Sequence, residues 1–121
     1  MARSLEAKAT LQVKEDGQRR DAHTANSTIA DLTKLFHTVL VLNTNTQNYQ
    51  VNFGSGFSTP THMLIREQNG RTLTYSIGAT THHHPIAANG FILAHSRIPS
   101  LYLSVSSSPT TRPQVEIVLA R

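Results

Sequence analysis

The chain has 121 residues, a length that indicates one domain with a single compact core. It contains no cysteine, which excludes disulfide frameworks, thiolate metal sites and cysteine nucleophiles. The net charge of +4 is small and comes from scattered residues, so we expect no nucleic-acid partner although the isoelectric point is about 10.0.

The N-terminal third differs in composition from the rest of the chain. Residues 1–34 carry mixed charges, whereas residues 35–121 contain neither lysine nor aspartate and are rich in Thr, Ser and Asn. We therefore predict an N-terminal arm at 1–34 and a folded body at 35–121. The chain begins without the apolar segment of a signal peptide, and no window has the roughly 18 to 20 apolar residues that cross a bilayer. We expect synthesis in a cytoplasm and no membrane partner.

Within the arm, the segment "KATLQVK" at 8–14 predicts a strand. Residues 15–30 have few apolar side chains, so they predict a long loop or a mobile arm. Only "NSTIADLTKLF" at 26–36 has room for a helical turn or two, with Asn26 or Ser27 as its cap.

The body alternates short apolar runs with turn-forming residues. Residues 39–42 are apolar on both faces, which predicts a central or doubly covered strand, and "GFILAH" around Ile92 is similar. Three further runs follow the period of two that strands require, at 49–53, 101–105 and 115–119. Breakers such as "GSGFSTP" and "SSSPTTRP" separate them. Roughly eight short strands at this spacing predict an all-β fold, either an antiparallel β-sandwich or a jelly-roll-like barrel.

The segment "HMLIREQNGRTLTYSI" at 62–77 predicts a β-hairpin. Asn69-Gly70 is the strongest short signal for a two-residue type I′ turn, since both turn positions need positive φ. With that turn the side facing the core would hold the pairs Leu64 with Tyr75, Arg66 with Leu73, and His62 with Ile77.

Three consecutive histidines, His82 to His84 in "TTHHHPIAANG", raise the question of a metal site. On a strand His82 and His84 share a face, and His62 or His95 could supply a third ligand, but a site needs ligands that converge and are held in place. Only Glu67 and Glu116 provide side-chain carboxylates in the body. We expect no native metal and no cofactor, and interpret the stretch as a polar strand edge or inter-subunit segment, or as an adventitious nickel or zinc binder.

Catalytic motifs are not convincing in this sequence. His95 and Ser96 are neighbours, so on a strand their side chains diverge, and no G-x-S-x-G serine elbow is present. We therefore predict that the chain is not an enzyme. Sugar binding stays open as an alternative although the chain lacks tryptophan; Tyr49 and Tyr75 are expected to face inward and Tyr102 outward.

The C-terminal segment "GFILAHSRIPSLYLSVSSSPTTRPQVEIVLAR" resembles the end of many small virion proteins of tailed phages. The likeness consists of a Gly-aromatic entry, the run "SLYLSVSS", a Thr/Pro loop and the final "VEIVLA" strand. "VLNTNTQNYQVNFG" and the 62–77 segment suit the same class. The resemblance covers about residues 35–121, and it implies a β-sandwich that decorates or cements a capsid, or another head or tail component.

That resemblance implies a homo-oligomeric, non-enzymatic virion protein located on the capsid surface, with the major capsid protein or other virion proteins as partners. A cement protein stabilises the shell by burying surface between coat subunits, and an extended arm can add a strand to an exposed sheet edge. The expected partner-binding residues lie in the arm: Thr10, Leu11, Gln12, Val13, Arg19 and Arg20. Two alternatives remain, an arm folded back on its own sandwich and a carbohydrate-binding or adhesion module.

Overall fold

The computed structural model describes residues 3–54, 57, 59–105 and 111–121. The chain forms two compact units, Met1–Thr33 and Lys34–Arg121. All regular structure among the described residues is antiparallel β-sheet. Within those ranges no helix long and apolar enough to cross a membrane occurs. The helical turns predicted at 26–36 are wrong, because this segment supplies the end of one strand and the start of the next.

The first unit is a long β-hairpin of β1 (Leu5–Glu15) and β2 (Gln18–Ile29). Asp16 and Gly17 join the strands with φ of 52° and 78°, and two positive φ values are the signature of a type I′ turn. The loop predicted at 15–30 is therefore wrong. A tight turn starts β2 at Gln18, and all residues of β2 except Arg20 have a register partner on β1, which the low apolar content of this segment does not reveal.

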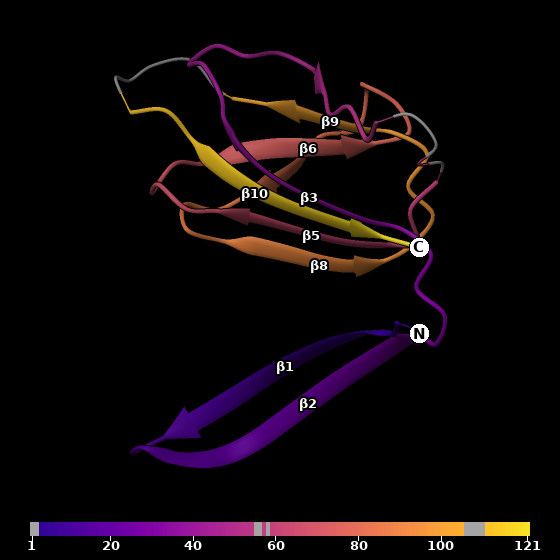
Figure 1. Cartoon of the computed structure of the whole chain (residues 1–121). Coiled ribbons are helices and arrows are strands. Elements are labelled where there is room, and N and C mark those ends of the chain that lie inside the picture. Colours follow the sequence, from indigo (N-terminus) through magenta and orange to yellow (C-terminus); the bar gives the residue numbers. More distant parts are fainter. Residues whose placement is uncertain (1–2, 55–56, 58, 106–110) are drawn as a thin grey trace. The chain divides into compact units, whose positions relative to one another are not determined.

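The second unit consists of two four-stranded sheets (Figure 1). The first has the order β3-β10-β5-β8, and the second has the order β4-β9-β6-β7. In the first sheet the strands are β3 (Leu35–Val41), β10 (Gln114–Ala120), β5 (His62–Glu67) and β8 (Phe91–His95). In the second they are β4 (Tyr49–Gln50), β9 (Leu101–Ser104), β6 (Leu73–Ile77) and β7 (His84–Ile86).

The strand orders are those of a jelly roll. Taken from both ends of the body, the strands pair as β3 with β10, β4 with β9, β5 with β8 and β6 with β7, and each pair is hydrogen-bonded and antiparallel. The body is therefore one long folded ribbon whose tip is the β6–β7 connection, rolled into two packed sheets. The predicted all-β sandwich or jelly-roll architecture is confirmed.

The core lies between the two sheets and follows the alternation seen in the sequence. Val115, Ile117 and Leu119 of β10 are fully buried, as are Leu101 and Leu103 of β9. The expectation of a central strand at 39–42 is wrong: β3 is an edge strand with an exposed outer face. The "GFILAH" strand, β8, forms the opposite edge of the same sheet, so its apolar content does not mark a central strand either.

The hairpin predicted at 62–77 is also wrong, because β5 and β6 belong to different sheets. β5 lies between β10 and β8, so both of its edges are occupied, and its buried face holds Met63, Ile65 and Glu67. Of the turn residues, only Gly70 has a positive φ, at 74°. The residues between β5 and β6 cross from one sheet to the other. The pairing of β5 with β10 and β8 outweighs the local turn signal of Asn69-Gly70.

Two of the predicted breaker segments are described only in part. Residues 55–56 and 58 of "GSGFSTP" and residues 106–110 of "SSSPTTRP" lie outside the described residues.

Candidate functional site

The most elaborate polar arrangement in the body surrounds the carboxylate of Glu67. This side chain is buried at the end of β5, where the chain leaves its sheet. Oε2 accepts from the backbone N–H of Asn69 at 2.8 Å and of Gln114 at 3.3 Å. Oε1 accepts from the N–H of Arg71 at 2.8 Å and of Asn89 at 3.1 Å. One carboxylate thus ties together the β5–β6 connection, the β7–β8 connection and the start of β10.

These hydrogen bonds determine the ionisation of Glu67. Burial alone would raise the pKa of this carboxyl, but the N–H groups of Arg71, Asn89, Asn69 and Gln114 hold its pKa below the usual range. The group is therefore a charged structural clamp whose oxygens are all committed to the protein's own backbone. The sequence contained a signal for this arrangement, since Glu67 directly precedes the Gln-Asn-Gly connection whose backbone it binds.

The three histidines of "TTHHHP" lie on and before β7, at the tip of the rolled ribbon. His82, His83 and His84 are all exposed, and the ring of His84 lies 5.3 Å from that of Tyr75. Across the part of the chain that the structure describes, no group of three or more His, Asp or Glu side chains could hold a metal ion.

Two other histidines do come together, on neighbouring strands of the first sheet. His62 of β5 and His95 of β8 are register partners, and their rings stack at 4.2 Å with an interplanar angle of 15°. The Nδ1 of His62 lies 3.1 Å from the hydroxyl of Thr61. Burial lowers the pKa of His62, and His95 lowers it further. The site therefore favours the neutral form of the His62 imidazole.

The outer face of the first sheet carries an ion-pair group at its centre. Glu116 of β10 is bound at 2.8 Å by Arg66 of β5 and lies 3.1 Å from the Nε2 of His37 on β3. Around it the edge strand β3 exposes Leu35, Val39 and Val41. The carboxylate of Glu116 is thus paired across three adjacent strands.

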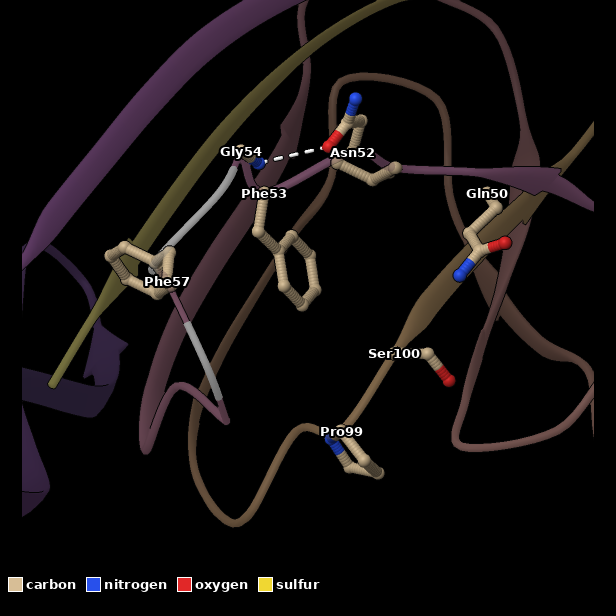
Figure 2. Close-up of a pocket in the computed structure, with 8 residues that line it drawn as sticks. Gln50, Asn52, Phe53, Gly54, Phe57, Pro99 and Ser100 are labelled. Carbon is tan, nitrogen blue, oxygen red and sulfur yellow. Dashed lines mark hydrogen bonds between the residues drawn. The ribbon is translucent and has the colours of Figure 1, made fainter.

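A hollow of about 400 Å³ lies beside β4, lined by residues 50–54, 57 and 99–100 (Figure 2). The Phe53 ring and the Gln50 amide point toward it, whereas the Asn52 side chain turns back to accept from the N–H of Gly54 at 2.9 Å. Phe53 and Phe57 also make edge-to-face contacts with each other, with ring centroids 6.3 Å apart.

Phe36 completes this aromatic cluster, with centroids 6.3 Å from each of the other two rings. The rings are therefore partly engaged in packing against the core. Among the tyrosines, the expected orientation is wrong for Tyr49, which is exposed, and Tyr102 is only partly exposed. Tyr75 packs against the core as expected.

The six arm residues expected to bind a partner all lie on the exposed hairpin. Successive strand residues face opposite sides, so Leu11 and Val13 share one face of β1, and Thr10 and Gln12 share the other. Leu11 is 72% exposed and Val13 is 54% exposed. The other two, Arg19 and Arg20, lie near the tip of the hairpin.

At this tip the ladder is irregular, since Arg19 opposes Lys14 whereas Asp21 opposes Val13. Arg20 is the extra residue on β2, and its Nε lies 3.7 Å from Glu15. This exposed pair contributes little to stability.

Comparison with known proteins gave no match: neither a family model, nor a curated protein, nor a solved structure is significantly similar to the chain. The resemblance to small virion proteins of tailed phages therefore stays a prediction from the sequence.

Proposed function

We propose that this chain is a non-enzymatic virion structural protein of the capsid decoration type, which binds neighbouring coat subunits through its N-terminal hairpin. The observation that carries the proposal is the hairpin itself. Its strands have 11 and 12 residues, one face of β1 is apolar, and among the described residues no third strand joins this sheet.

The two faces of the hairpin differ in chemistry. One face carries Leu5, Ala7, Ala9, Leu11 and Val13 of β1, with Ile29, Ser27, Ala25, His23 and Asp21 of β2 opposite them, so its apolar side chains lie mainly on β1. The other carries Glu6, Lys8, Thr10, Gln12 and Lys14, with Thr28, Asn26, Thr24, Ala22 and Arg19 opposite. An isolated two-stranded hairpin is marginally stable in water, and a hydrophobic face with a further layer is what stabilises it. A partner surface that covers the apolar face would supply that layer.

The energetic contribution of such docking is sufficient for a cement protein. Burying a Leu or Val side chain contributes about 1.5–3 kcal/mol, so Leu11 and Val13 together would supply several kcal/mol for each docked copy. If the chain binds the assembled shell and not the free coat subunits, this free energy stabilises the shell by mass action. The charged residues at the tip would remain at the solvated rim of the contact.

The architecture of the body supports the same class of function without deciding it. Jelly rolls are common in viral capsid proteins and also in lectins, and a fold alone does not assign a function. The hairpin is therefore the feature that supports a decoration role, and a test of this role must separate the two hairpin faces.

The test compares two double variants that add the same charge on opposite faces. Leu11→Lys with Val13→Lys places lysines on the apolar face, and Thr10→Lys with Gln12→Lys places them on the polar face. We expect the first variant to lose binding to capsids that lack the protein. The second variant should bind these capsids with an affinity within about threefold of the wild-type value. Equal binding by both variants would show that the apolar face is not the docking surface.

Hydrogen exchange of the wild-type chain provides an independent check. Amides of 5–29 should become more protected when the chain is bound to particles than when it is free. Equal protection in both states would remove the hairpin from the interface.

The hollow beside β4 favours a second candidate, a carbohydrate-binding or adhesion module. It combines the Gln50 amide and the Ser100 hydroxyl with the ring of Phe53, which is the mixture of polar and aromatic groups found in small-ligand sites. Glycan-array binding by the free chain, lost on Gln50→Ala, would support this candidate. Binding to capsids alone would support the decoration role.

A further inference from the structure

The body has four sheet edges, and they are not equally protected against pairing. β7 contains Pro85, and β4 is only two residues long. β8 has five residues. β3 has seven residues, pairs with β10 without any register shift, and contains no proline, glycine or lysine. Natural edge strands are usually short, or contain a proline, a lysine or a bulge that prevents pairing with another chain. β3 has none of these features and is therefore the least protected edge of the body.

The hydrogen bonds at the two ends of β3 show which of its backbone groups face outward. Lys34 and Arg121 exchange both N–H···O bonds at 3.1 Å, and the N–H of Leu42 donates to Pro113 at 3.0 Å. Since such pairs alternate along an antiparallel ladder, the even-numbered residues of β3 bond to β10. The N–H and C=O groups of Leu35, His37, Val39 and Val41 therefore point to the open edge of the sheet.

We propose that two copies of this chain associate through β3, as an antiparallel pair about a two-fold axis at Thr38. In this register Leu35 lies opposite Val41 of the second copy, and His37 lies opposite Val39. All outward N–H and C=O groups then meet a partner, because every pair joins two odd-numbered residues. The result is one continuous eight-stranded sheet across the dimer.

The side chains at this edge are complementary to themselves in the same register. Leu35, Val39 and Val41 share the outer face and are 48%, 45% and 59% exposed. The two-fold axis brings Leu35 and Val41 together at each end of the contact, so apolar surface meets apolar surface. No residue of β3 is an acid, a lysine or an arginine, so no fixed charges of like sign oppose each other.

The inner side chains of β3 are compatible with the same pairing. Phe36 would lie opposite Leu40 of the second copy, and Thr38 would lie opposite itself. Phe36 and Leu40 already pack against the core of their own body. The new contact would therefore extend the core of each body. The inference goes beyond the capsid role, since the dimer needs neither coat protein nor the hairpin.

The first test is sedimentation velocity of the full chain without particles, comparing the wild type with Val39→Pro and Val39→Thr. Proline at residue 39 removes an outward N–H, which proline tolerates on an edge strand, and leaves the bonds to β10 intact. We expect the wild type to dimerise and the threonine variant to have a dimer dissociation constant within about threefold of the wild-type value. The dissociation constant of the proline variant should be at least about tenfold higher, because two hydrogen bonds are lost per dimer. A monomeric wild type, or a proline variant as dimeric as the threonine variant, would overturn the proposal.

The second test checks the register and does not depend on how proline is tolerated. Leu35→Lys with Val41→Lys opposes two lysines at both ends of the contact, whereas Leu35→Glu with Val41→Lys opposes glutamate and lysine. We expect the first variant to be monomeric and the second to dimerise. Equal behaviour of the two would exclude this register. Particle binding is measured separately, so a failed dimer and a failed capsid role are distinguishable.

Discussion

Replacing Glu67 by glutamine tests how the body is held together where its ribbon crosses between the two sheets. The amide keeps the shape of the side chain but has one oxygen in place of two. That oxygen can still accept two of the four N–H groups, while the new NH₂ faces the other two N–H donors. The substitution therefore removes two charge-assisted hydrogen bonds and leaves buried donors without an acceptor.

The expected cost follows from those losses. Hydrogen bonds to a charged group contribute about 1.5–3 kcal/mol each, and an unsatisfied buried donor costs about 1–3 kcal/mol. We expect Glu67→Gln to lower the free energy of unfolding by about 2–5 kcal/mol, which is a large part of the total of a domain this small. The midpoint of thermal unfolding should fall by about 10 °C or more.

The pH dependence gives this prediction a second, independent signature. The pKa of Glu67 is lowered from its ordinary 4.5 in the folded state, so its contribution is present above that value and is lost as the pH falls through the folded pKa. Urea unfolding at several pH values should therefore show the wild type and Glu67→Gln converging below about pH 4.5.

Glu116→Gln is the matched control, because Glu116 is the other glutamate of the body and its ion pairs lie on the sheet surface. We expect that variant to lose at most about 1 kcal/mol. If Glu67→Gln were no more destabilising than Glu116→Gln, and did not converge with the wild type at low pH, the clamp assigned to Glu67 would be refuted.

Three further predictions concern other parts of the chain. The lowered pKa of His62 means that the folded state resists its protonation, so the stability of the wild type should fall as the pH drops below 6.5. The free energy of unfolding of His62→Phe should fall less between pH 7.5 and pH 5.5. An equal fall in the two proteins would contradict this account. Gly17→Ala should cost the hairpin about 1 kcal/mol, since φ is +78° there, and unchanged amide exchange in β1 would argue against the turn. Ile117→Ala should cost about 2–5 kcal/mol in urea unfolding, and a loss under 1 kcal/mol would be inconsistent with its complete burial.

The sequence predicted those parts of the fold that depend on local alternation. The period of two at 115–119 and 101–105 identified β10 and β9 with their inward residues, because side-chain direction along a strand is fixed by the backbone. The all-β class followed from the same signal. Strand partners did not, because pairing is decided between segments far apart in the chain, as for β3 with β10.

The two Asx-Gly pairs show where local signals mislead. Asp16-Gly17 forms the tight turn and has two positive φ values, whereas Asn69-Gly70 lies in a crossing connection fixed by Glu67. Both pairs have the composition of a type I′ turn, and only the availability of the flanking strands for each other separates them. The open edge of β3 could not be predicted either, since a strand that is apolar on both faces is typical of the middle of a sheet.

The measurement that tests the proposed function most directly is the copy number of this chain in purified virus particles, determined by quantitative mass spectrometry against the coat protein. The decoration role predicts a simple whole-number ratio to the coat protein, with the chain on the outer surface of the shell. Absence of the chain from purified particles would contradict the proposal.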